Sequence, residues 1–266
     1  MSSYLYLVSS GPVNLLLVRW KIKKFWSFSD SLLNDLCGLC GVVNVCYLAL
    51  SKSQCTLQLA GCNFSCKGCF SSARAGAGRD VSVEDIVERM PLGRRVLIAG
   101  GEPTLQAREL LELLSLLRGR RVILSTNGYF LSDRVVEGLS GSEVHLDLKA
   151  YTESIHMEYT GRSNLPVLEA VERLHRYSVD FEVETVLIPG VVDSSEIERV
   201  AEFLSSISRD ISLRIIRYVP VNGFSRRPTV EELEMAVSLA ERHLSYVTTS
   251  VEVRNHPVGG RVKIFF

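Results

Sequence analysis

From Cys55 onward, short apolar runs alternate with longer segments whose apolar residues recur at helical spacing. The short runs predict strands and the longer segments predict helices. The predicted strands are Thr56–Ala60, Arg95–Ala99, Val122–Ser125, Glu143–Leu148, Phe181–Ile188 and Ser212–Tyr218, and the predicted helices are Val83–Met90, Leu105–Leu117, Asp133–Leu139, Leu165–Tyr177, Ser194–Ser206 and Thr229–His243. Right-handed strand-helix crossovers repeated six times curl a parallel sheet into a barrel. We therefore expect an α/β fold, a partial (β/α)6 TIM-type barrel.

A chain of this length can enclose one large core. It has 266 residues, of which 46% are hydrophobic, and single-domain α/β barrels reach this size. We expect an N-terminal extension over residues 1–54, with a possible auxiliary metal site, and a barrel domain over residues 55–266 that ends in a helix and a strand. Thirty basic residues balance thirty acidic ones, so the charge predicts no nucleic-acid partner.

Three cysteines lie on one short loop directly after the first predicted strand. Cys62, Cys66 and Cys69 have the spacing C-x3-C-x2-C. Thiolates suit iron-sulfur clusters, and a cubane cluster normally takes four of them. Because this loop supplies only three, one iron is left open to bind a molecule that reacts. The spacing therefore predicts a catalytic iron-sulfur cluster with an open iron.

Short glycine-rich or polar motifs follow the next three predicted strands. Gly100–Pro103 follows the second strand, Thr126–Gly128 follows the third, and Asp147 to Lys149 ends the fourth. Taken singly, such motifs are more often ordinary turns. A barrel places its chemistry at the carboxyl ends of its strands, however, so their order beside the cysteine loop indicates a binding site. The candidate cofactor contacts are Gly100, Gly101, Glu102, Pro103, Thr126, Asn127, Asp147 and Lys149.

Asp147 and Lys149 are two positions apart on one predicted strand, so their side chains point to the same face. Charges on the inner face of a barrel are costly unless they are paired or bound to a ligand. Either the two residues contact a ligand, or they form a buried ion pair that fills the barrel. His145 lies on the same face, and it is the histidine that we would test first.

Cys62, Cys66 and Cys69, followed by Gly100–Pro103, resemble the motifs of the radical S-adenosylmethionine (radical SAM) superfamily. The resemblance implies a partial (β/α)6 barrel and a [4Fe-4S] cluster held by the three cysteines. It also implies that the open iron chelates S-adenosylmethionine, with Gly100, Gly101 and Glu102 near its amino group. An electron from the cluster, which a donor such as ferredoxin or flavodoxin supplies, then yields a 5′-deoxyadenosyl radical that abstracts hydrogen. The protein would then be an oxidoreductase.

Within that superfamily, the chain resembles the activating enzymes of glycyl radical enzymes. The runs Leu146–Lys149, His156–Gly161 and Leu187–Asp193 are similar, in order, to a run in pyruvate formate-lyase activases. The resemblance implies a glycyl radical enzyme as the partner. Two positions depart from those activases. Ser125 stands where they have an aspartate that helps to hold a monovalent cation, and the segment from Arg217 lacks a histidine that they carry.

The remaining four cysteines lie upstream of the cluster loop. Cys37, Cys40, Cys46 and Cys55 have the spacing C-x2-C-x5-C-x8-C. Four thiolates would complete a zinc site or a second iron-sulfur cluster. Alternatively, Cys46 and Cys55 are buried core residues, because their neighbours are apolar. A cysteine-rich segment before the barrel also resembles the activase-like radical proteins encoded with a Memo-type partner, which implies radical modification of another substrate.

A third hypothesis assigns the chain to a different functional class, the non-catalytic iron-sulfur proteins that transfer electrons. The motif Gly100–Pro103 argues against it, because a passive cluster needs no open iron beside an amino-acid cradle. Seven cysteines, three of them in a metal-type cluster, favour a reducing cytoplasm over a secreted disulfide framework. The apolar N-terminus is interrupted by polar residues and reads as neither a signal peptide nor a transmembrane segment. The aromatic and basic segment from Trp20 to Phe28 either packs on the barrel or anchors at an interface.

Overall fold

The computed structural model describes residues 41–71, 73, 78–221, 223–250 and 263–265. They belong to one compact unit, Gly41–Phe266, whereas the other unit, Met1–Cys40, lies outside the described residues. The segment from Trp20 to Phe28, Cys37 and Cys40 are thus not described. Within the described part, no helix has both the length and the apolar character needed to cross a membrane.

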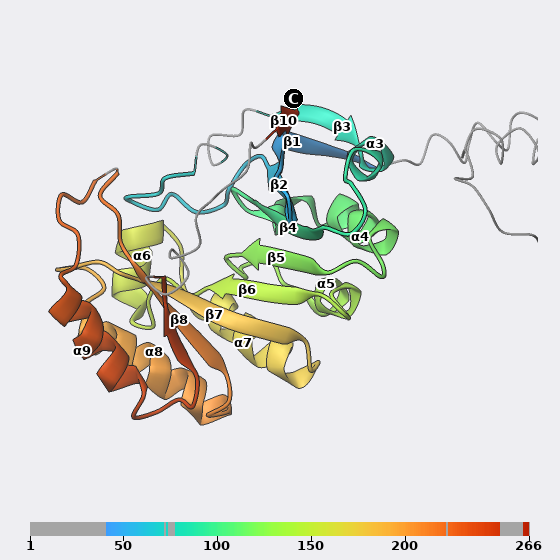
Figure 1. Ribbon diagram of the computed structural model, residues 1–266. Coiled ribbons are helices and arrows are strands. Elements are labelled where there is room, and N and C mark those ends of the chain that lie inside the picture. Colours follow the sequence, from blue (N-terminus) through green and yellow to red (C-terminus); the bar gives the residue numbers. More distant parts are fainter. Residues whose placement is uncertain (1–40, 72, 74–77, 222, 251–262, 266) are drawn as a thin grey trace, which may run out of the picture. The chain divides into compact units, whose positions relative to one another are not determined.

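The unit is built on a ten-stranded sheet with the order β10-β1-β2-β4-β5-β6-β7-β8-β9, and β3 pairs with β1 (Figure 1). The strands are β1 (Val42–Leu50), β2 (Gln54–Leu59), β3 (Arg79–Ser82), β4 (Arg95–Gly100), β5 (Val122–Thr126), β6 (Glu143–Asp147), β7 (Asp180–Leu187), β8 (Ser212–Arg217), β9 (Val247–Thr249) and β10 (Lys263–Phe265). Neighbouring strands from β2 to β9 run parallel, and β1 runs antiparallel to its three partners. The six predicted strands and the α/β fold are confirmed. β1 lies before residue 55, where we expected the barrel domain to begin.

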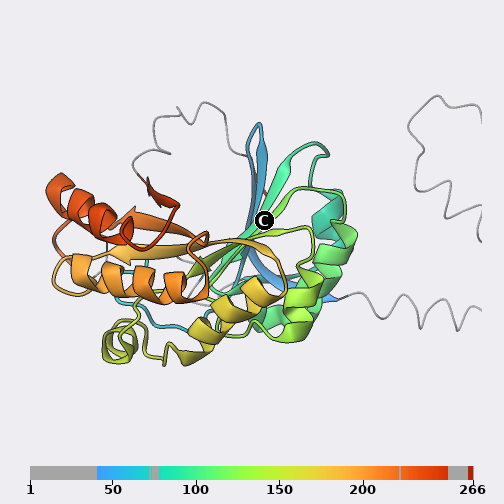
Figure 2. The same ribbon diagram turned by 90° about the horizontal axis from the view of Figure 1, so that it is seen from below.

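Helices connect the parallel strands and lie along one side of the curved sheet (Figures 1 and 2). They are α3 (Val83–Glu88), the 3-10 helix η2 (Pro103–Gln106), α4 (Ala107–Leu116), α5 (Asp133–Gly138), α6 (Glu153–Thr160), α7 (Leu165–Arg176), α8 (Ser194–Ile207) and α9 (Val230–Ala240). Local signals start several of them. The Ser82 hydroxyl accepts a hydrogen bond from the Asp85 amide at the start of α3, and Thr229 and Glu232 form a capping box at the start of α9.

The two faces of the parallel strands differ in chemistry. On β6, Val144 and Leu146 are completely buried in the core that the helices cover, whereas His145 and Asp147 alternate with them and are only partly buried. Since successive side chains of a strand point to opposite faces, the charged residues of β6 share the face turned away from the helices. The inner face of the barrel is thus polar at β6.

Candidate functional site

The three predicted cluster cysteines lie on the loop that leaves the carboxyl end of β2 (Figure 1). Among the described residues, the sulfur atoms of Cys62, Cys66 and Cys69 do not all lie within 4.8 Å of one another, as ligands of a single ion would. A cubane cluster distributes its thiolates over separate irons, so a wider spacing fits a cluster better than a mononuclear ion. The donor set therefore fits the predicted group.

Burial raises the pKa of Cys66 to about 11, although the nearby Lys149 ammonium acts in the opposite direction. Burial likewise raises the pKa of Cys62, and the Glu102 carboxylate adds to this rise. Both thiols are therefore protonated near neutral pH without a metal. Metal binding would displace these protons, because only the thiolate is a ligand.

The cysteine loop is hydrogen-bonded to the end of α6. The Ser65 amide donates to the Thr160 carbonyl at 2.8 Å, and the Lys67 amide donates to the Tyr159 carbonyl at 3.0 Å. The Ser65 hydroxyl also lies 3.1 Å from the Thr160 carbonyl. These contacts join residues about ninety positions apart in the chain. The C-terminal turn of α6 thus fixes the middle of the cysteine loop.

Aromatic packing in the core also anchors the same loop. Phe64 is buried, and its ring packs edge to face against Tyr129 and His156, with centroid separations of 5.7 and 5.5 Å. His156 is completely buried, and its Nδ1 lies 2.8 Å from the Arg162 carbonyl. Burial lowers the pKa of His156, so the ring is neutral. The run His156–Gly161 therefore acts in the structure as a support for the cysteine loop.

Gly161 ends α6 with a φ of +80°, and a Cβ added there would lie 2.6 Å from the Ser65 hydroxyl. We expect Gly161→Ala to lower the free energy of unfolding by more than the roughly 1–2 kcal/mol that a left-handed conformation costs, because it also displaces Ser65. Gly141→Ala is the matched control, since Gly141 has the same φ and no heavy atom within 4 Å of its Cβ position. Urea unfolding of the two variants measures the difference. Equal losses of stability in the two variants would contradict the close packing of Gly161 against Ser65.

The glycines of the next motif bring β4 close to the cysteine loop. The Gly101 amide donates to the Leu59 carbonyl at 3.0 Å, and the Glu102 amide donates to the Gly61 carbonyl at 2.7 Å. A Cβ on Gly101 would lie 1.8 Å from the Gly61 carbonyl oxygen, so only glycine allows this approach. The glycine pair thus joins the end of β4 to the start of the cysteine loop.

The Glu102 side chain points into the protein and is completely buried. Its carboxylate accepts hydrogen bonds from the backbone and hydroxyl of Thr104 at 2.9 and 2.6 Å, from the Thr126 hydroxyl at 2.6 Å and from the Asn127 amide at 2.7 Å. Burial raises the pKa of Glu102, and these donors act against the rise. We expected this carboxylate near a ligand ammonium, but in the structure it links the motif after β4 to the motif after β5.

The motif after β5 reaches back to the cysteine loop. The Asn127 side chain donates to the Asn63 side-chain oxygen at 2.8 Å, and its amide nitrogen lies 4.0 Å from the Cys62 sulfur. Three of the predicted motifs are therefore connected by a chain of hydrogen bonds through Glu102 and Asn127. Pro103, which we also predicted as a cofactor contact, is the first residue of η2 and is buried.

Asp147 and Lys149 form an ion pair in which the ammonium nitrogen lies 2.7 Å from a carboxylate oxygen. Burial alone would lower the pKa of Lys149, but the Asp147 carboxylate raises it above its ordinary value, so the lysine stays charged. The Lys149 ammonium is close enough to the cysteine loop to oppose the rise in pKa that burial causes at Cys62 and Cys66. The structure thus brings the fourth motif to the same site as the other three.

Cys46 and Cys55, the two described members of the predicted second group of cysteines, lie apart in the structure. Cys55 pairs with Leu50 in the β1–β2 ladder, and Cys46 lies four residues further along β1. At about 3.4 Å per residue, roughly 14 Å of strand separates Cys46 from the position opposite Cys55, which is too far for ligands of one ion. Cys55 is completely buried in the apolar core. The described residues thus do not support Cys46 and Cys55 as ligands of one ion, and Cys37 and Cys40 lie outside the described residues.

The sequence analysis named the run His156–Gly161 but gave no role to Asn63, Phe64, His156 or Thr160, which position the cysteine loop. It also singled out His145 but not the glutamates around it. Burial alone would lower the pKa of His145, but hydrogen bonds to Glu184 and Glu143 raise it to about 9.

Comparison with known proteins adds to this geometry. The family model described as the radical SAM superfamily matches residues 59–204, more than half of the chain. The chain belongs to the radical SAM superfamily. Membership implies a [4Fe-4S] cluster and S-adenosylmethionine, whose cleavage is general to the family. The matched segment begins at the end of β2 and includes the cysteine loop and the motifs after β4, β5 and β6.

Two curated relatives are informative for this radical SAM protein. A Methanocaldococcus jannaschii protein named "Putative glycyl-radical enzyme activating enzyme" is 35% identical over 264 residues, which cover 94% of this chain and 98% of the relative. The pyruvate formate-lyase-activating enzyme of Listeria monocytogenes is 25% identical over 180 residues, which cover 60% of this chain and 73% of the relative. The first similarity extends over nearly the whole of both chains.

Solved structures with the same fold are found at low sequence identity. A domain of pyruvate-formate lyase-activating enzyme from Bacteroides vulgatus superposes with a TM-score of 0.52 at 20% identity, covering 58% of this chain and 98% of that one. Streptococcus suis SuiB bound to S-adenosylmethionine gives 0.59 at 17% identity, covering 71% of this chain and 48% of SuiB. These likenesses support the partial-barrel fold of the radical SAM superfamily.

Proposed function

We propose that this protein is an activating enzyme that uses S-adenosylmethionine to generate a glycyl radical on a partner enzyme. One observation carries the proposal: the three-cysteine loop is held by hydrogen bonds against the motif after β4 and against α6, at the edge where β5 and β6 end. The relative that is 35% identical over nearly its whole length supports the activating-enzyme class.

In this proposal Cys62, Cys66 and Cys69 hold three irons of a [4Fe-4S] cluster. When bound and reduced, that cluster supplies the electron for cleavage of S-adenosylmethionine. The protein's own residues keep the three thiols in place: Phe64 anchors the loop in the core, and the end of α6 fixes its middle. The Lys149 ammonium, which lies near Cys66, would favour the thiolate form that a metal needs.

The motifs at the neighbouring strand ends would bind the methionine part of S-adenosylmethionine. The backbone at Gly100 and Gly101 carries no Cβ, so a ligand can approach it closely. Because the Glu102 carboxylate already accepts hydrogen bonds from Thr104, Thr126 and Asn127, we propose that it positions this backbone and leaves the ligand contact to main-chain atoms. Lys149 offers a cation to the ligand carboxylate.

The proposal extends to the electron donor, the compartment and the N-terminal residues. An electron donor such as ferredoxin or flavodoxin would reduce the cluster, and the reaction would take place in the cytoplasm, where thiols stay reduced. The extension that we expected over residues 1–54 would be limited to the residues before Gly41, because β1 belongs to the sheet, and Cys37 and Cys40 would remain candidate ligands of a second metal.

The first test is whether the same genome encodes a glycyl radical enzyme, because its absence would contradict the proposal. The second test uses that enzyme as the partner. We expect anaerobic incubation of that enzyme with the cluster-loaded, reduced protein and S-adenosylmethionine to produce a doublet in the EPR spectrum, because a glycyl radical retains one α-hydrogen. Substituting the partner's radical glycine by alanine should remove the doublet. If 5′-deoxyadenosine forms while the partner stays EPR-silent, the activase role is contradicted although cleavage of S-adenosylmethionine stands.

A further inference from the structure

Five charged side chains share one face of β6, β7 and β8. We call them the wall cluster: Glu143, His145, Glu182, Glu184 and Arg214. The strand register places His145 opposite Glu182, and Glu184 opposite Arg214. All five are partly buried, with 14 to 28% of each side chain exposed. They lie on the inner face of the barrel, and the proposed function does not use them.

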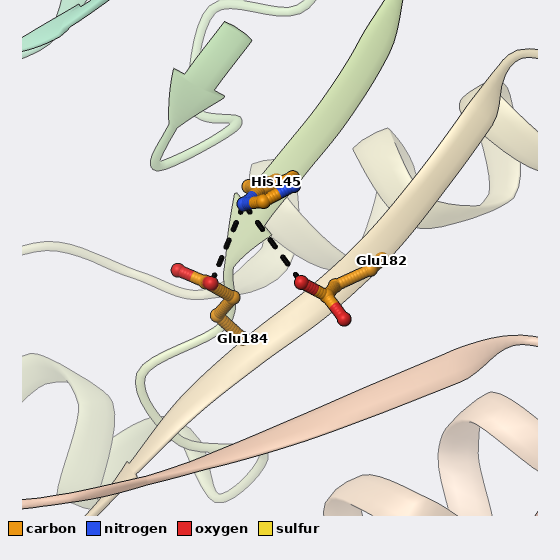
Figure 3. Close-up of side chains that lie close together, drawn as sticks. All are labelled: His145, Glu182 and Glu184. Atoms are coloured by element: carbon orange, nitrogen blue, oxygen red, sulfur yellow. Dashed lines mark ion pairs between the residues drawn. The ribbon is translucent and has the colours of Figure 1, made fainter. Parts of the chain in front are cut away.

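Three members of the wall cluster converge on one point. His145 Nδ1 lies 3.4 Å from Glu184 Oε1 and 3.8 Å from Glu182 Oε1, and the three candidate ligand atoms all lie within 4.8 Å of one another (Figure 3). Two ligands about 2.1 Å from one ion are about 3.4 Å apart at a tetrahedral angle. The observed separations therefore match those of nitrogen and oxygen atoms around a single transition-metal ion.

The other nitrogen of the imidazole has the partner that a metal-binding histidine needs. His145 Nε2 lies 3.0 Å from Glu143 Oε1. With Nε2 donating to Glu143, a metal ion that displaces the Nδ1 proton would find the Nδ1 lone pair directed toward Glu182 and Glu184. A carboxylate that orients the ring in this way accompanies most histidine ligands of metals. Glu143 thus provides the second contact, independent of the three converging atoms.

The charge balance also favours a dication. Once an ion has displaced the Nδ1 proton of His145, the imidazole is neutral, and the three carboxylates and the Arg214 guanidinium sum to two negative charges. Arg214 Nη1 lies 3.5 and 3.3 Å from the Glu182 and Glu184 oxygens, which is longer than the roughly 2.7–2.9 Å of a strong charged hydrogen bond. Next along β6, Asp147 is already paired with Lys149. Arg214 therefore compensates only part of the negative charge of the wall cluster.

We propose that His145, Glu182 and Glu184 bind one divalent transition-metal ion on the inner wall of the barrel, with Glu143 orienting the imidazole. One nitrogen and two carboxylate ligands suit ions such as Mn²⁺ or Zn²⁺. Three protein ligands leave a position open for water or for an oxygen atom of a bound molecule. The ion would lie near Asp147, because two strand residues span roughly 7 Å.

The test uses full-length, cluster-loaded protein with the cluster in its oxidised, EPR-silent state. Titration with Mn²⁺, followed by the loss of the free-ion EPR signal, should give one bound ion per chain. Pulsed EPR of that ion should detect coupling to one imidazole nitrogen. We expect His145→Gln to abolish the nitrogen coupling, and Glu184→Gln and Glu143→Gln each to weaken binding at least about tenfold. Calorimetric titration with Zn²⁺ repeats the binding measurement with a second ion.

The matched control is His243→Gln. His243 also lies near two glutamates, 3.7 Å from Glu198 and 4.0 Å from Glu202, but on the helical side of the unit. We expect this variant to bind Mn²⁺ like the unsubstituted protein. Circular dichroism checks that each variant is folded. If neither ion binds with a stoichiometry that depends on His145, the wall cluster is an ion-pair network only and the proposal is overturned.

Discussion

Replacing Cys66 by alanine is expected to reduce the iron content from roughly four atoms per chain to below about one, and to abolish cleavage of S-adenosylmethionine. Cys66 lies between the other two cysteines of the loop. The backbone amides of its neighbours, Ser65 and Lys67, are hydrogen-bonded to the end of α6. No other described cysteine lies on this loop, so a replacement ligand is not at hand. Iron analysis and the charge-transfer absorption of the cluster measure the loss after anaerobic reconstitution.

Cys46→Ala is the matched control for this experiment. It removes one partly exposed thiol from β1, which pairs with the end of β2 beside the start of the loop but does not belong to the loop. We expect the cluster absorption of this variant to equal that of the unsubstituted protein. Equal losses of iron in the two variants would contradict the assignment of the cluster to the loop. A loss of zinc in Cys46→Ala would instead point to a second metal near Cys46.

The second large effect is expected at Glu102. Glu102→Gln should lower the free energy of unfolding by about 2–3 kcal/mol, because hydrogen bonds to a charged group contribute about 1.5–3 kcal/mol each and a buried amide cannot accept all of them. Four donors from Thr104, Thr126 and Asn127 converge on the carboxylate. The glutamine NH2 group would face at least one of these donors. Urea unfolding at neutral pH measures the change.

Glu88→Gln is the control, because Glu88 is exposed at the end of α3. We expect this variant to unfold at the same urea concentration as the unsubstituted protein. We also expect Glu102→Gln to release iron to a chelator faster, since Glu102 and Asn127 connect three motifs of the site. Unchanged stability together with lost binding of S-adenosylmethionine would show that the carboxylate contacts the ligand, contrary to our account.

The central strands could be predicted because each connects to a helix and buries one apolar face. β5 and β6, for example, lie within one residue of the predicted ranges. The edge of the sheet was harder to predict. β1 reads VVNVCYLAL, and a register shift between Val45 and Tyr47 interrupts its alternation, so the period-two pattern is weak. β3 and β10 have four and three residues, too few to show any period.

For the site, the sequence predicted which residues would gather but not how they would contact one another. Strand ends place the cysteine loop and the motifs at Gly100, Thr126 and Asp147 along one edge. The direction of the Glu102 side chain and the packing of Phe64 on His156 depend on contacts between segments far apart in the chain, which no local pattern encodes. The same holds for the wall cluster, whose members come from three strands.

Production of 5′-deoxyadenosine from S-adenosylmethionine tests the central claim most directly. The protein is loaded with iron and sulfide under anaerobic conditions, reduced with dithionite, and incubated with S-adenosylmethionine, and the products are separated by chromatography. We predict 5′-deoxyadenosine and methionine in equal amounts, and neither product with the Cys66→Ala variant. A fully loaded, reduced sample that binds S-adenosylmethionine but forms no 5′-deoxyadenosine would contradict the assignment of radical chemistry to this site.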